Sequence, residues 1–132
     1  MPSRKKPRIL LVEDNDELRE ITAAVLTEEG YDVLGLENGQ EAIRHVLVDK
    51  RRPDLIILDL MMPKVSGLEF LAVRATNDHA KKIPVIVMSA MPLEGALPKD
   101  TLFLAKPVLD NALAKNVAAV LAQHKKKTPK KR

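Results

Sequence analysis

The feature that most constrains the fold is a set of five short apolar runs, mostly separated by segments with helical periodicity. Each run has the length of a strand, and the runs occupy residues 9–12, 31–36, 55–58, 85–88 and 102–105. The first, third and fourth are continuously apolar rather than alternating, which is typical of strands covered on both faces of a parallel sheet. None is long enough to cross a membrane.

The segments between the runs carry helical patterns. The first is predicted to bury a stripe at helical spacing, made of Leu18, Ile21, Thr22, Val25 and Leu26. Gly30 is expected to end this helix. Asn38, with Glu41 three residues later, predicts the start of a second helix, and Ser66 with Glu69 predicts the start of a third. The last helix has an apolar stripe of its own, made of Leu113, Val117, Val120, Leu121 and His124.

Strands that alternate with helices predict an α/β domain with helices on both faces of the sheet. Because crossovers between parallel strands are right-handed, we expect a doubly wound sheet of five parallel strands. Residues 90–100 break the rhythm, since they contain two prolines and a glycine. Both residue types disfavour helix, so a fourth helix is expected to be short or irregular.

The charges divide the 132-residue chain into one folded unit and two tails. Residues 1–8 carry four Lys or Arg, residues 125–132 carry six, and neither segment has an acid, whereas the net charge between them is −6. We therefore expect a basic N-terminal tail over residues 1–7, a domain over 8–124 and a basic tail over 125–132. Such tails are usually solvated and disordered. Binding to nucleic acid or another acidic surface is the alternative, although no aromatic residues interleave the lysines for base stacking.

The location indicated by the sequence is cytoplasmic. There is no cysteine, so disulfides and thiolate metal sites are excluded, which fits a reducing compartment. The basic start, MPSRKKPR, is not followed by a long apolar run, so a secretory signal is not expected.

Polar side chains follow four of the predicted strands. Glu13 and Asp14 come after the first, Asp59 after the third, Ser89 after the fourth and Lys106 after the fifth. Ligands of open parallel sheets bind beyond the carboxyl ends of the strands, so we expect these five groups to converge. Clustered carboxylates repel one another unless a cation compensates, and Mg²⁺ prefers oxygen ligands.

This set of groups suits phosphoryl transfer. An ionised aspartate such as Asp59 is a nucleophile toward phosphorus, and the reaction needs positioning and charge neutralisation more than covalent help. Lys106 and Mg²⁺ would neutralise phosphoryl oxygens, and the Ser89 hydroxyl would donate a hydrogen bond to one of them. Taken singly, an acidic pair after a strand is more often a helix start and an isolated serine a loop hydroxyl, so the combination carries the prediction.

The segments LLVEDN, LDLMMPKVSGLEF, VIVMSA and AKP, in this order, resemble the receiver domains of response regulators. The resemblance covers residues 8–124 and implies the flavodoxin-like strand order 2-1-3-4-5. This order is one of the common ones in doubly wound sheets, and a receiver is among its known examples. It implies that Asp59 is the phosphoacceptor. It also implies that Mg²⁺, or Mn²⁺ in its place, binds Asp14, Asp59 and the backbone carbonyl of Met61, with Glu13 acting mainly through water.

The same resemblance implies a switch. Phosphorylation would draw Ser89 inward, and Phe103 would follow into the space released, while Lys106 binds the phosphoryl group and precedes a cis peptide bond to Pro107. The phosphoryl donor would be a histidine kinase or a histidine phosphotransfer protein, and the output a change in binding to an unknown protein. The domain would be a signalling module rather than an enzyme with an external substrate, catalysing only its own phosphorylation and slow dephosphorylation.

Two features depart from the typical receiver. The short crossover over residues 90–100 predicts that dimerisation through the fourth-helix face is weak or absent. No effector domain follows residue 124, so a stand-alone receiver or a fragment of a longer regulator is expected. Met61 and Met91 lie two residues after Asp59 and Ser89, where they either shield the acyl phosphate from water or simply fill gaps.

Other functions fit the sequence less well. A phosphorylation-independent docking module would have no need of all five pocket groups. A metal-dependent phosphatase of related fold would need a second acid two residues after Asp59, where Met61 stands. Neither GxxxxGK[ST] nor GxGxxG occurs, and the three histidines are scattered, so nucleotide binding and a histidine metal site lack support.

Overall fold

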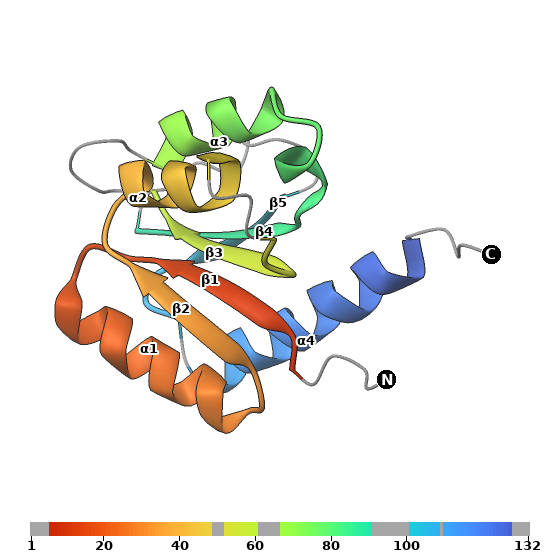
Figure 1. Ribbon diagram of the computed structural model, residues 1–132. Coiled ribbons are helices and arrows are strands. Elements are labelled where there is room, and N and C mark those ends of the chain that lie inside the picture. Colours follow the sequence, from red (N-terminus) through yellow and green to blue (C-terminus); the bar gives the residue numbers. More distant parts are fainter. Residues whose placement is uncertain (1–5, 49–51, 61–66, 91–100, 109, 128–132) are drawn as a thin grey trace.

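In the computed structural model, one sheet of parallel strands carries helices on both faces (Figure 1). The structure describes residues 6–48, 52–60, 67–90, 101–108 and 110–127. The strands are β1 (Arg8–Val12), β2 (Asp32–Leu36), β3 (Leu55–Asp59), β4 (Val85–Ser89) and β5 (Thr101–Ala105). The α-helices are α1 (Asp16–Glu28), α2 (Gly39–Ile43), α3 (Gly67–Ala75) and α4 (Asp110–Lys127). A π-helical segment, η1 (Arg44–Val48), continues α2, and a short 3₁₀ turn, η2 (Ala80–Lys82), precedes β4.

The strand order is β2-β1-β3-β4-β5, and every neighbouring pair is parallel. This confirms the doubly wound, flavodoxin-like fold expected from the sequence. Strand β1 pairs with β2 on one side and with the central strand β3 on the other, so that Ile9 lies opposite both Val33 and Leu55. All five strands lie within one residue of their predicted limits.

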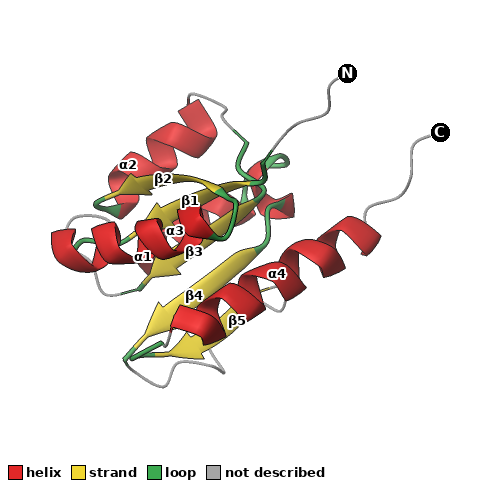
Figure 2. Ribbon diagram, turned by 90° about the horizontal axis from the view of Figure 1, so that it is seen from below, coloured by secondary structure: helices red, strands yellow, loops and turns green. Residues whose placement is uncertain are grey.

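The sheet separates two apolar cores. Helices α1 and α4 cover one face, and α2 and α3 cover the other (Figures 1 and 2). In β1, Ile9 and Leu11 point into the α1–α4 core, whereas Leu10 and Val12 point into the α2–α3 core. Because both faces are covered, every residue of β3 and β4 is buried, which explains why these strands read as continuous apolar runs.

The predicted inner stripe of α1 is partly wrong. Leu18 and Ile21 are 43% and 51% exposed, whereas Leu26 is fully buried. The less exposed positions of the helix include Arg19, Thr22, Ala23 and Leu26, which follow the spacing i, i+3, i+4, i+7. The aliphatic stem of Arg19 packs beside Gly35 of β2. An arginine stem can cover apolar surface while its charged head makes polar contacts. The buried face of α1 is therefore rotated by a fraction of a turn from the face that hydrophobic patterning predicts.

Two predicted helix ends, at Asn38 and at Gly30, are confirmed, and a third differs by three residues. Asn38 Oδ1 accepts a hydrogen bond from the Glu41 amide at 2.9 Å, so Asn38 caps α2. Gly30, with φ of 101°, follows α1 in the left-handed conformation that favours glycine. Helix α4 extends to Lys127, three residues beyond the boundary expected at residue 124.

Several predictions fall outside the described residues. These concern Ser66 at the start of the third helix, Met61 and Met91. They also concern residues 91–100, where a short helix before β5 and its dimer face were in question, and the ends of both tails. None of the helices in the described part of the chain is long and apolar enough to cross a membrane.

Candidate functional site

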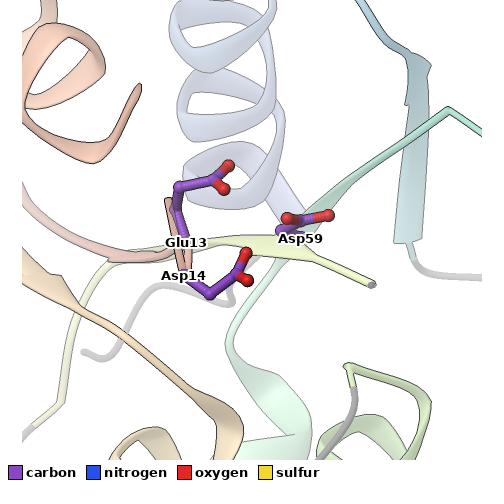
Figure 3. A group of neighbouring side chains, drawn as sticks. All are labelled: Glu13, Asp14 and Asp59. Atoms are coloured by element: carbon purple, nitrogen blue, oxygen red, sulfur yellow. The ribbon is translucent and has the colours of Figure 1, made fainter. Parts of the chain in front are cut away.

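The predicted groups meet at the carboxyl edge of the sheet. Glu13 and Asp14 follow β1, Asp59 ends β3, Ser89 ends β4 and Lys106 follows β5. Parallel strands bring all their carboxyl ends to one edge. Figure 3 shows the three carboxylates gathered in this region, with Glu13 and Asp14 on one segment and Asp59 on the neighbouring strand.

The distances define a tight cluster of charges. Lys106 Nζ lies 3.3 Å from Glu13 Oε1 and 3.3 Å from Asp59 Oδ2. One carboxylate oxygen from each of Glu13, Asp14 and Asp59 lies within 4.8 Å of the other two. Glu13 and Asp59 are buried and Asp14 is exposed, so the cluster opens to solvent on the side of Asp14.

Three hydrogen bonds hold Glu13 in place, two through its backbone and one through its carboxylate. The Glu13 amide donates to Leu36 O of β2 at 3.0 Å. Arg19 Nη1 donates to the Glu13 carbonyl oxygen at 2.8 Å. The Asn15 amide donates to Glu13 Oε2 at 3.2 Å. Asn15 also caps α1 by accepting from the Leu18 amide at 2.9 Å, so the helix begins directly after the acids.

Asn15 and Arg19 are site residues that the sequence reading missed. Asn15 carried a visible signal, since asparagine is a preferred cap residue and stands directly before a helical segment. Arg19 carried a weaker one, because its position matches the spacing of Ala23 and Leu26 only if an arginine is allowed on an inner face.

Two backbone contacts support the other side of the site. The Lys106 amide donates to Ser89 O at 2.9 Å, which joins the ends of β4 and β5. The predicted cis bond between Lys106 and Pro107 is present. Gly67, at the start of α3, lies so close to β3 that an added Cβ would be 2.7 Å from Leu60 Cα and 2.8 Å from the Asp59 carbonyl oxygen. A residue with a side chain would therefore push against the backbone that carries Asp59.

Burial and crowding change the acid–base properties of the cluster. Burial, and next the negative charge of Asp59, raise the pKa of Glu13 above 4.5. For Lys106, burial alone lowers the pKa, but the carboxylates of Asp59 and Glu13 together outweigh it and raise the pKa above 10.5. The ammonium group therefore stays charged and only partly offsets three acids.

These residues fit a hard divalent cation. The donors are oxygens only, one of them on an exposed carboxylate, and three carboxylates share this space with the ammonium group of Lys106. Mg²⁺ and Mn²⁺ prefer oxygen ligands and retain waters where the protein leaves coordination positions open.

Ser89 and Phe103, the predicted switch residues, lie on the neighbouring strands β4 and β5. Ser89 is fully buried at the end of β4. Phe103 lies on β5 opposite Val87 and packs partly buried against the α2–α3 core. Their roles remain predictions.

Comparison with known proteins assigns the family. The sequence-family model named response regulator receiver domain matches residues 9–119 of the chain. The chain belongs to the response regulator receiver family. This receiver domain is 38% identical over 85 residues to the CAI-1 autoinducer sensor kinase/phosphatase CqsS of Vibrio cholerae, a match that covers 64% of the chain and only 12% of CqsS.

Two further relatives match more of their own length. The polar-differentiation response regulator DivK of Brucella anthropi is 34% identical over 87 residues, which covers 66% of this chain and 69% of DivK. The crystal structure of the signal receiver domain of a putative LuxO repressor from Vibrio parahaemolyticus is 32% identical and superimposes with a TM-score of 0.80, over 92% of this chain and 95% of that one. The matched unit is thus a signalling domain that occurs in regulators of very different length.

Proposed function

We propose that this receiver domain accepts a phosphoryl group on Asp59 from a phosphohistidine of a histidine kinase or phosphotransfer protein. The proposal rests mainly on the position of the Asp59 carboxylate, which is buried at the end of β3. Lys106 Nζ lies 3.3 Å from it, and the carboxylates of Glu13 and Asp14 lie beside it. Most of the other aspartates in the described residues lie on the exposed surface, so Asp59 is distinguished by its setting rather than by its type.

The proposed transfer uses this setting directly. A carboxylate oxygen of Asp59 forms a bond to phosphorus as the phosphorus–nitrogen bond of the donor breaks, and the imidazole keeps the electron pair of that bond. Lys106, held by Glu13 and Asp59 before the reaction, is placed to bind the transferred oxygens. Its raised pKa keeps it cationic at neutral pH, so it supplies charge without prior protonation.

The residues that would hold Mg²⁺ are Asp14, Asp59 and the backbone carbonyl of Met61, with Glu13 acting mainly through water. Met61 lies outside the described residues. When bound, the ion supplies neutralisation of the negative charge that the phosphoryl group brings into an already anionic site.

The proposed output is a change of partner binding that begins at Ser89. A phosphoryl group on Asp59 would attract the Ser89 hydroxyl from the neighbouring strand β4, and Phe103, one strand farther out, would follow.

The test is phosphorylation by a small acyl-phosphate donor in the presence of Mg²⁺, followed by intact-protein mass spectrometry. We expect a gain of one phosphoryl group that Asp59→Asn abolishes and that EDTA prevents. Asp78→Asn, which removes an exposed carboxylate that is not part of the cluster, is the matched control and should be modified like the wild type. A wild-type protein that gains no mass, or an Asp59→Asn variant that gains as much, would refute the proposal.

A further inference from the structure

The guanidinium group of Arg19 connects the loop that carries the acidic pair with the first turn of α1. Its side chain is only 19% exposed. Nη1 donates to the Glu13 carbonyl oxygen at 2.8 Å, and Nη2 donates to Asp16 Oδ1 at 2.6 Å. Since Asp16 is in the first turn of α1, the guanidinium connects the loop that carries Glu13 and Asp14 to the helix that follows it.

The stem of Arg19 depends on Gly35. A Cβ added at Gly35 would lie 3.1 Å from both Cγ and Cδ of Arg19, closer than most such contacts. The next residue, Leu36, accepts the hydrogen bond from the Glu13 amide. The Glu13 peptide groups are therefore held on one side by β2 itself and on the other by an arginine that lies across β2.

We propose that Arg19 is a positioning residue, which holds the acidic pair in the arrangement that admits a divalent cation, and that Gly35 provides the space its stem needs. The inference rests on the proposed function, because it assigns the cation to Glu13, Asp14 and Asp59. Arg19 acts through the backbone of Glu13 and is not itself a ligand.

The inference is testable because a positioning role and simple charge repulsion predict opposite effects of removing Arg19 on cation binding. Arg19 is a cation beside an anionic cluster, so its removal should tighten the binding of another cation by Coulomb's law. If Arg19 positions the acids, its removal should weaken that binding despite the lost repulsion. Residues that orient metal ligands commonly affect affinity about tenfold or more.

The experiment measures Mn²⁺ dissociation constants of the full chain by the EPR signal of free Mn²⁺. Arg19→Met keeps the length of the stem but removes the donors, and we expect it to weaken Mn²⁺ binding about tenfold. Arg19→Lys keeps a donor and the charge, and should recover part of the loss. Arg44→Met removes an exposed arginine from the second helical segment, and should bind Mn²⁺ like the wild type.

Substitution of Gly35 tests the proposal independently. Gly35→Ala should weaken Mn²⁺ binding by about threefold by displacing the Arg19 stem. In an Arg19→Ala background there is no stem to displace, so adding Gly35→Ala should change nothing further. If Arg19→Met fails to fold, as judged by circular dichroism, Gly35→Ala and Arg19→Lys still decide the matter.

A kinetic readout separates positioning from general damage. With the small acyl-phosphate donor, Arg19→Met should need about tenfold more Mg²⁺ for half-maximal rate while the rate at saturating Mg²⁺ stays near that of the wild type. Unchanged or tighter Mn²⁺ binding in Arg19→Met would overturn the inference while leaving the proposed function intact. A wild-type chain that neither binds Mn²⁺ nor accepts a phosphoryl group would overturn both.

Discussion

Lys106 Nζ lies 3.3 Å from Asp59 Oδ2, although Lys106 follows β5 and Asp59 ends β3, and β4 separates these strands. Asp59 is buried and Lys106 is one-quarter exposed. The pair thus spans the sheet at its carboxyl edge, and Lys106 faces Glu13 at the same distance. The ammonium group is therefore shared by two buried acids.

Replacing Lys106 should destabilise the metal-free protein. Lys106→Met leaves two buried carboxylates without their cation, and we expect a loss of about 2 kcal/mol in the free energy of unfolding, since uncompensated buried charge is costly. The pKa of Glu13, already raised by burial and by Asp59, should rise further. Urea unfolding in EDTA measures the change.

The chain offers a matched control for this variant. Lys81 Nζ also lies 3.3 Å from an aspartate, Asp78, but both side chains are exposed. Lys81→Met should change stability by less than about 0.5 kcal/mol because exposed ion pairs contribute little. Equal losses in the two variants would contradict the assigned role of burial.

Mg²⁺ should stabilise the folded chain. A ligand that binds only the folded state adds about 2.7 kcal/mol at a concentration one hundred times its dissociation constant. Asp14→Asn removes the exposed carboxylate of the proposed metal site and should greatly reduce this gain, whereas Asp78→Asn should retain it. Thermal unfolding in MgCl₂ against NaCl of equal ionic strength is the measurement, and stabilisation that persists in Asp14→Asn would argue against the site.

Gly67 is predicted to tolerate no side chain. Gly67→Ala would force Cβ to within 2.7 Å of Leu60 Cα and 2.8 Å of the Asp59 carbonyl oxygen, and overpacking of this kind costs about 1–3 kcal/mol. The displaced end of β3 should also slow phosphorylation of Asp59. Gly30→Ala is the comparison, because Gly30 has open space around it and only its φ of 101° disfavours alanine. It should lose about 1 kcal/mol without affecting phosphorylation.

Tyr31 should make stability fall at alkaline pH. Burial, and then the charge of Glu29, raise the pKa of Tyr31 above 10.0. The folded state therefore keeps the phenolic proton when the unfolded state has lost it. Stability from this source is fully present below pH 10.0 and is lost as the pH rises from 10.0 through the folded-state pKa.

This effect can be read directly, because Tyr31 is the only tyrosine and the chain has no tryptophan. Absorbance at the phenolate band reports the pKa of Tyr31 in the folded and urea-unfolded protein. Tyr31→Phe should flatten the alkaline decline, and equal pKa values in the two states would show that the assigned burial is wrong.

The sequence predicted the sheet and the placement of the charged groups well, for a physical reason. Strands buried on both faces must be continuously apolar, and the carboxyl ends of parallel strands lie at one edge, so the sequence alone predicts that Glu13, Asp59 and Lys106 lie together. The strand order came from the family resemblance, and the structure confirms it.

The inner face of α1 could not be predicted in the same way. Hydrophobic patterning counts arginine as polar and therefore predicts that Leu18 and Ile21 face inward, whereas the structure exposes them and packs Arg19 beside Gly35. The space for that stem exists only because a residue without a side chain lies on β2, across the helix–strand contact. The π-helical continuation of α2, over Arg44–Val48, likewise had no signal in the apolar spacing.

Lys106 and Glu13 are separated by 93 positions in the chain, yet their side chains touch. Neither the first half of the sequence nor the second contains both the acids and their counter-charge. A molecule whose last strand has not docked exposes carboxylates with no ammonium group among them, and on the proposed chemistry it is a poor acceptor. On the same proposal, acceptance of a phosphoryl group would depend on docking of the last strand, and incompletely folded molecules would not respond to the donor.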